Sequence, residues 1–153
     1  MMPRCHSQVT KMNTKLTRRV IAWFAITAAS TALTFAEAKP EAEAQKAAEQ
    51  WLALVDAGKF AESWDTAAAY FKGAVSKDQW QGSMVAMRKP LGDLVSRKLK
   101  TAKYAKTLPG APDGEYVVLQ FDTSFANKKT AVETITPLLD KDGKWRVSGY
   151  FIK

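Results

Sequence analysis

The chain has 153 residues, of which 23 are Lys or Arg and 15 are Asp or Glu, and its net charge is +8. Its one cysteine, Cys5, and its one histidine, His6, both lie within the first six residues. The rest of the sequence therefore excludes disulfide bonds, Ser-His-Asp or cysteine catalysis, and zinc, iron or copper sites with His or Cys ligands.

The first predicted element is an export signal. Basic residues precede an apolar run, and small residues follow it, in the order Lys15, Arg18, Arg19, residues 20–35, Ala36 and Ala38. This order is typical of a secretory signal peptide with an A-x-A cleavage motif. An uncleaved membrane anchor is the less favoured interpretation, because the run is shorter than the roughly 20 apolar residues of a spanning helix.

We expect cleavage after Ala38, with Ala36 as the second choice, and a periplasmic or secreted product without a transmembrane span. A signal peptide of ordinary length also begins at Met12, so the true start codon stays open. Residues 39–153 are long enough for a single domain with one core. Residues 1–38 hold five of the basic and one of the acidic residues, so the net charge of the remainder falls to +4. Nucleic acid is therefore not an expected partner.

Three helices are predicted after the cleavage site, because apolar residues recur there at spacings of three and four. Their expected bounds are 40–57, 59–72 and 76–90. Gly58 and Gly73 end the first two helices. Ser76 lies three residues before Gln79, a spacing that matches a capping box at the start of the third helix.

Beyond Gly92, apolar residues recur at every second position instead of every third or fourth, which predicts strands. The four expected strands lie within 93–107, 115–125, 128–139 and 141–153. Short turn-rich links, such as 108–114, favour an antiparallel meander. Pro137 is expected at an edge or a bulge. Three helices packed on one face of a four-stranded antiparallel sheet make an α+β fold.

One set of residues resembles domain of unknown function family 4019, which is found in exported bacterial proteins, over nearly all of residues 39–153. The matching positions are Trp51, Asp56, Gly58, Ser63-Trp64-Asp65, Trp80, Arg88, Pro90-Leu91-Gly92, Arg97 and Gly143-x-Trp145-x-Val147. The order of elements is also similar to the cystatin-like and nuclear-transport-factor-2-like folds. These folds host enzymes and binding modules alike, so the resemblance implies neither an activity nor catalytic residues.

Aromatic residues at helical spacing raise the question of a ligand pocket. Trp51, Trp64, Phe71 and Trp80 either line such a pocket or fill the core between helices and sheet. We favour the core, because a small domain needs large aromatic side chains to bury enough area.

Asp65 follows Trp64, and two arginines flank the corner at residues 90–92. A carboxylate beside an aromatic cluster can act as a general base. We favour instead an ion pair of Asp65 with Arg97 or Arg88, because a carboxylate without a histidine partner is weak support for acid–base catalysis.

The first strand is rich in lysine. Lys98, Lys100 and Lys106 are expected on one face and Lys103 on the other. Such a strip suits an anionic partner, but alternating lysines also protect an edge strand from aggregation. We favour the protected edge.

The favoured function is a non-enzymatic binding module for a small ligand or an envelope protein, which would bind in the groove between the helices and the sheet. The candidate ligand-binding residues are Trp64, Asp65, Trp80, Arg88, Arg97 and Tyr150. The alternatives are a histidine-free hydrolase or isomerase that uses Asp65 with Tyr70 or Tyr150, and an envelope assembly factor that acts through the lysine strand. No cofactor or metal is predicted, because the turn at 140–144 lacks the further ligands of a calcium loop.

Overall fold

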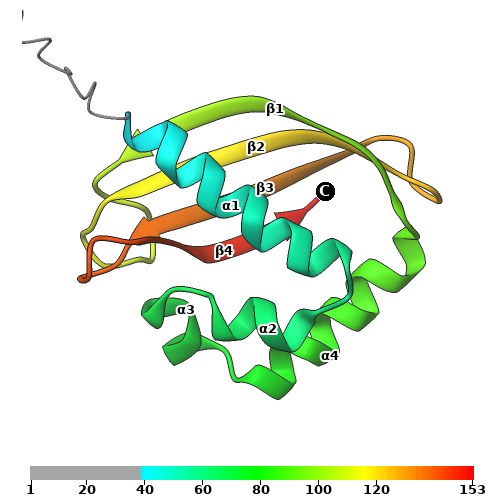
Figure 1. Cartoon of the computed structure of the whole chain (residues 1–153), viewed down its shortest axis with the longest axis horizontal. Coiled ribbons are helices and arrows are strands. Elements are labelled where there is room, and N and C mark those ends of the chain that lie inside the picture. Colours follow the sequence, from blue (N-terminus) through cyan, green and yellow to red (C-terminus); the bar gives the residue numbers. More distant parts are fainter. Residues whose placement is uncertain (1–38) are drawn as a thin grey trace, which may run out of the picture. The chain divides into compact units, whose positions relative to one another are not determined.

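The computed structural model describes residues 39–153 (Figure 1). The signal peptide and start codon predictions lie outside these residues. The elements are α1 (Pro40–Asp56), α2 (Phe60–Asp65), α3 (Ala69–Ala74), α4 (Lys77–Arg88), a 3-10 turn (Lys89–Leu91), β1 (Leu94–Ala105), β2 (Tyr116–Phe125), β3 (Ala131–Leu139) and β4 (Trp145–Ile152). The predicted α+β class, with helices before a four-stranded antiparallel sheet, is confirmed.

The four strands form one sheet in the order β1-β2-β3-β4, with antiparallel pairing throughout. The sheet is therefore the predicted meander. A register shift between Thr136 and Pro137 confirms that this proline lies at a bulge.

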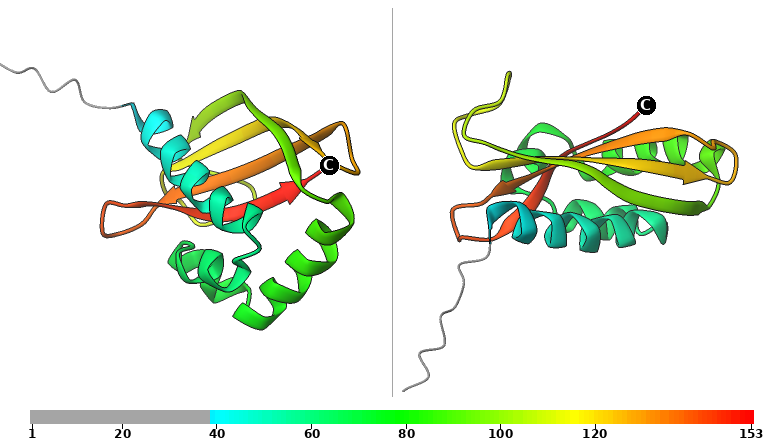
Figure 2. Two further views of the ribbon diagram at one scale, coloured as in Figure 1. Left: turned by 45° about the vertical axis from the view of Figure 1, so that its right-hand side comes forward. Right: turned by 90° about the horizontal axis from the view of Figure 1, so that it is seen from above.

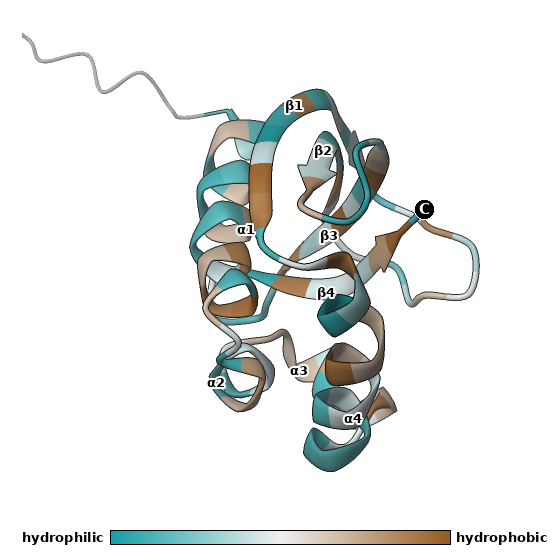
Figure 3. Ribbon diagram, turned by 90° about the vertical axis from the view of Figure 1, so that its right-hand side faces the viewer, coloured by the Kyte–Doolittle hydropathy of each residue, from teal (hydrophilic) through white to brown (hydrophobic). Residues whose placement is uncertain are grey.

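The helices do not all cover the same face of the sheet. α1 crosses one face and contacts all four strands, whereas α2, α3 and α4 lie beyond β4 (Figures 1 and 2). Figure 3 shows polar and apolar residues alternating around α1 and α4, as expected for amphipathic helices with one buried side. Within residues 39–153, no helix has the length and apolar character needed to cross a membrane.

The helix predicted over 59–72 is two helices, α2 and α3, separated by Thr66, Ala67 and Ala68. The Ala68 backbone N–H donates to the Val147 carbonyl of β4 at 2.8 Å rather than continuing the helix. Ala67 and Ala68 are fully buried, and their small side chains let the backbone approach the strand. A tertiary hydrogen bond thus interrupts a segment whose local sequence favours a helix.

The capping box at the start of α4 is confirmed. Ser76 Oγ accepts from the Gln79 backbone N–H at 3.3 Å, and the Ser76 N–H donates to Gln79 Oε1 at 3.1 Å. These two bonds satisfy donors that a helix start otherwise leaves unpaired.

The lysines of β1 lie on an edge strand, but the expected division between its faces is wrong. The strand register shifts between Leu99 and Thr101. As a result, Lys98 lies opposite Asp122 and Lys103 lies opposite Val118. Asp122 and Val118 are four residues apart in one strand, so both lysines point to the same face. The bulge in β1 causes this difference.

Candidate functional site

A partly buried network of charged and hydroxyl side chains joins the helices to the sheet. We call it the arginine–carboxylate network, and its members are Asp56, Arg88, Arg97, Thr123, Glu133 and Tyr150. They come from the ends of α1 and α4 and from all four strands. Three of them, Arg88, Arg97 and Tyr150, are residues that the sequence singled out.

Glu133 is the centre of the network and is 0 % exposed. Arg97 donates to both of its carboxylate oxygens, from Nε to Oε2 at 2.5 Å and from Nη2 to Oε1 at 3.1 Å. The Tyr150 hydroxyl donates to Oε1 at 2.5 Å, and the Thr123 hydroxyl donates to Oε2 at 2.8 Å. Such charge-assisted bonds satisfy a carboxylate that burial would otherwise destabilise.

Asp56 is the second carboxylate of the network. Its two oxygens accept from Arg97 Nη1 and Nη2 at 2.7 and 3.0 Å, and Oδ1 also accepts from Arg88 Nη2 at 2.7 Å. The Arg88 guanidinium lies over the Phe125 ring, 4.4 Å from its centroid. Arg97 therefore bridges the two carboxylates, and Arg88 fixes the end of α4 against α1.

The protonation states in this network favour a structural role. Burial raises the pKa of Tyr150, and the neighbouring Glu133 charge raises it further. Burial alone would lower the pKa of Arg97, but its bonds to Asp56 and Glu133 raise it overall. Tyr150 stays a neutral donor and Arg97 stays a cation, so two arginines balance two carboxylates. No buried side-chain polar atom among residues 39–153 lacks a hydrogen-bond partner.

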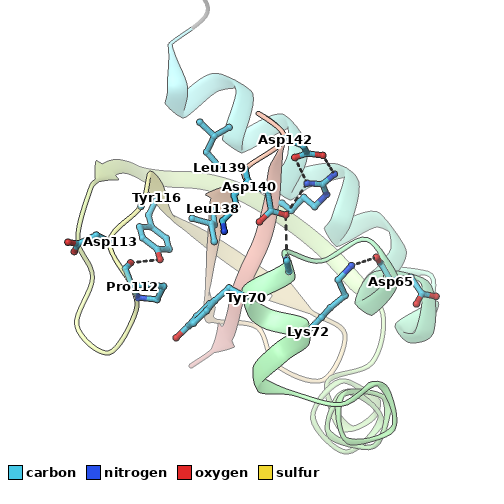
Figure 4. Close-up of a pocket in the computed structure, with 14 residues that line it drawn as sticks. Asp65, Tyr70, Lys72, Pro112, Asp113, Tyr116, Leu138, Leu139, Asp140 and Asp142 are labelled. Atoms are coloured by element: carbon cyan, nitrogen blue, oxygen red, sulfur yellow. Dashed lines mark hydrogen bonds and ion pairs between the residues drawn. The ribbon is translucent and has the colours of Figure 1, made fainter.

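A separate hollow lies on the face of the sheet opposite α1, where Tyr116, Leu138 and Arg146 pair across three strands (Figure 4). Its volume is about 860 Å³. α3 forms one wall, and the loop before β2 and the turn between β3 and β4 form the others. We call it the Tyr70 hollow.

The floor of the Tyr70 hollow is apolar. Tyr116 and Leu138 are buried there, whereas the Tyr70 side chain of α3 is 40 % exposed. The Tyr70 hydroxyl donates to the Gly110 carbonyl at 3.1 Å, and the Tyr116 hydroxyl donates to the Pro112 carbonyl at 2.7 Å. These two bonds tie the loop before β2 to α3 and to the sheet.

The rim of the hollow is polar. Arg146 Nη1 donates to Asp140 Oδ2 at 2.9 Å, and Arg146 Nη2 donates to Asp142 Oδ2 at 2.7 Å. Asp140 Oδ2 also accepts from the backbone N–H of Ala69, at 3.4 Å, which links the turn to the start of α3. An apolar floor beneath a few converging polar groups is the usual composition of a small-molecule site.

The model of the family described as "Protein of unknown function (DUF4019)" matches residues 47–150, more than half of the chain. The chain belongs to the DUF4019 family. No curated protein matches the sequence. The family match includes all of β1, β2 and β3, most of β4 and the second half of α1, so both the arginine–carboxylate network and the Tyr70 hollow lie within the DUF4019 domain.

Side chains fill the space between the helices and the sheet of this DUF4019 domain, where the sequence suggested a groove. The Trp51 and Trp80 ring centroids are 5.7 Å apart, and Phe71 and Tyr150 contact the Trp80 ring. Ser63 anchors both indoles, because its carbonyl accepts from Trp51 Nε1 at 2.7 Å and its Oγ accepts from Trp80 Nε1 at 3.0 Å. The prediction that the aromatic residues fill the core is confirmed for Trp51, Phe71 and Trp80, and Trp64 packs against this core while it stays partly exposed.

The predicted ion pair of Asp65 with Arg97 or Arg88 is wrong. Asp65 Oδ2 accepts from Lys77 Nζ at 2.6 Å, and its side chain is 53 % exposed at the edge of the Tyr70 hollow. Trp64 beside it is half-buried and donates from Nε1 to the Val75 carbonyl at 2.7 Å. Trp64 and Asp65 therefore lie apart from the network that holds Arg88, Arg97 and Tyr150.

Three features are not predicted from the sequence: Glu133, Asp56 as an ion-pair partner, and the Tyr70 hollow. A signal for Glu133 was present, because it alternates with Ala131 and Ile135 on the inward face of β3. A carboxylate at such a position needs a cationic partner. The hollow had no comparable signal, because its walls come from three segments far apart in the sequence.

We predict a pH dependence that involves Asp142. Its hydrogen bonds with Arg146 lower its pKa from 3.8 to about 2. The stabilisation of the folded state by the charged Asp142 is therefore present above pH 3.8 and is lost as the pH falls towards 2. Thermal unfolding of Asp142→Asn should show a smaller loss of melting temperature over this interval than the unaltered protein. Equal losses would contradict the prediction.

Proposed function

We propose that this DUF4019 protein is an exported, non-enzymatic binding domain that holds a small ligand in the Tyr70 hollow. The observation that carries the proposal is an exposed tyrosine ring above a buried apolar floor, with charged groups around the rim. The volume of about 860 Å³ lies within the range of small-molecule sites, roughly 300–1,000 Å³. Loops on a rigid scaffold, which form much of this hollow, commonly carry binding residues.

The arginine–carboxylate network is a less suitable binding site. Its charges balance one another, and Glu133 and Arg88 are buried. A ligand would have to replace bonds that already satisfy both carboxylates, at the cost of leaving charges unpaired. Three of the candidate ligand-binding residues, Arg88, Arg97 and Tyr150, support the fold through this network, and a fourth, Trp80, packs in the aromatic core.

Export is supported by the basic residues, apolar run and A-x-A motif that precede Lys39. Sequencing the N-terminus of the protein recovered from the periplasm or the medium tests it. We expect the sequence to begin at Lys39, and recovery of the uncut chain in the cytoplasm would contradict export.

Ligand binding is tested by blocking the hollow. Ala69 is exposed at the start of α3 and lines the hollow, so Ala69→Trp should occupy part of the space that a ligand needs. The matched control is Ala74→Trp, at an exposed position of the same helix that does not line the hollow. A library of small organic fragments is titrated into each protein, and backbone amide shifts are followed by NMR.

We expect a subset of fragments to shift amides around Tyr70 and Leu138. Ala69→Trp should weaken this binding about tenfold or more, equivalent to about 1.4 kcal/mol. Ala74→Trp should leave it unchanged. Fragments that bind elsewhere, or that bind Ala69→Trp equally well, would overturn the proposal.

A further inference from the structure

We propose that the ligand of the Tyr70 hollow is a neutral saccharide, which rests on the proposed function of this hollow. Three features of the lining favour such a ligand. These are the balance of charge, the pairing of hydrogen-bond donors with acceptors, and one exposed aromatic ring.

The charges around the hollow nearly cancel. The charged lining residues are Asp65, Asp113, Asp140, Asp142, Lys72, Lys141 and Arg146. The four acidic residues outnumber the three basic residues by one, and Lys77, which pairs with Asp65, offsets this charge. A balanced lining has no net field that attracts a strongly anionic or cationic ligand. The hollow therefore favours a ligand without net charge.

The polar groups offer donors and acceptors side by side. Arg146 carries five N–H donors, and three hydrogen bonds join it to Asp140 and Asp142. Its side chain is partly exposed, so the remaining donors lie beside carboxylate oxygens that can accept further bonds. A hydroxyl group donates and accepts at once, and neighbouring hydroxyls on a sugar ring match this arrangement.

A purely apolar ligand fits the rim poorly. It would cover Asp140, Asp142 and Arg146 without replacing the water that hydrates them, and desolvating charged groups in this way is costly. A ligand with hydroxyl groups on its edge and C–H groups on its face avoids this cost. Saccharides have this composition.

The exposed Tyr70 ring supplies a platform for the apolar face of a sugar. Its hydroxyl is fixed by the bond to the Gly110 carbonyl, so the ring is held at the mouth of the hollow. Tyrosine provides a rigid, amphipathic contact surface at a small loss of side-chain freedom. The buried rings and methyl groups of Tyr116 and Leu138 continue this apolar surface inward.

The experiment titrates the purified protein with disaccharides and follows backbone amide shifts by NMR. Maltose and cellobiose represent glucans, and N,N′-diacetylchitobiose represents amino-sugar polymers. Digalacturonate, which is anionic, is the comparator for charge. We expect at least one neutral disaccharide to bind at the hollow more tightly than digalacturonate. The disaccharide that binds most tightly indicates whether the ligand is derived from a glucan or from an amino-sugar polymer.

Variants of Tyr70 locate the binding. Tyr70→Ala should weaken saccharide binding about tenfold or more, whereas Tyr70→Phe keeps the ring and should retain most of it. Phe151→Ala is the matched control, because Phe151 is 53 % exposed and lies outside the hollow. Equal weakening by Phe151→Ala would contradict a role for Tyr70 as the platform.

The outcomes separate this inference from the function on which it rests. If fragments bind at the hollow but no neutral disaccharide does, the saccharide assignment falls and the binding site stands. Preferential binding of digalacturonate also overturns the assignment. If neither fragments nor disaccharides bind at the hollow, both proposals fall.

Discussion

Replacing Arg97 with alanine should lower the free energy of unfolding by about 3–5 kcal/mol, the usual cost of removing one partner of a buried ion pair. Arg97 forms paired bonds to both Glu133 and Asp56. Without it, Glu133 stays fully buried with only a 3.5 Å contact to Arg88 and two hydroxyl donors. Chemical denaturation followed by tryptophan fluorescence measures the change.

The surface pair of Lys77 and Asp65 provides the control. Both side chains are exposed, so Asp65→Asn should change the free energy of unfolding by only about 0–1 kcal/mol. The contrast tests whether burial, rather than the presence of an ion pair, determines the cost. A loss below 1 kcal/mol for Arg97→Ala would show that the network contributes little to stability.

Truncating Trp80 to alanine should also cost about 3–5 kcal/mol, as large-to-small changes in a core usually do. Its ring contacts Trp51, Phe71 and Tyr150, and its indole N–H donates to Ser63. Removing the ring leaves a cavity where α1, α4 and β4 meet. The unfolding free energy in urea checks this expectation.

Two further variants separate packing from hydrogen bonding at Trp80. Trp80→Phe keeps most of the packing but removes the donor to Ser63, so about 1–3 kcal/mol should be lost. Val85→Ala, on the same helix, changes a side chain that is 49 % exposed and should stay within about 0.5 kcal/mol of the unaltered protein. If Trp80→Ala cost no more than Val85→Ala, the aromatic cluster would not be the stabilising core.

Local sequence patterns predicted the classes of the elements and most of their bounds, because periodicity and capping act over a few residues. The capping box at Ser76 and the bulge at Pro137 are examples. The break between α2 and α3 escaped prediction, since it depends on a hydrogen bond from Ala68 to a strand nearly eighty residues later. Patterns within a short stretch of sequence do not indicate such a long-range contact.

The pairing of charges was predicted less well than the fold. The sequence indicates Arg88 and Arg97 as candidates, but it favours Asp65, which adjoins Trp64, as their partner. The actual partners, Asp56 and Glu133, depend on how α1 and β3 meet in space. The strand register that places Glu133 opposite Phe121, and so beside Thr123, follows from the whole sheet rather than from its own neighbours.

The arginine–carboxylate network also bears on how quickly the protein unfolds. Arg88 and Glu133 are 45 residues apart in sequence, and Asp56 is 41 residues from Arg97. Contacts between such distant residues require loop closure and usually form late in folding. Interactions absent from the folding transition state mainly slow unfolding. We therefore expect the network to slow unfolding, and so to prolong the lifetime of the folded chain, without accelerating folding.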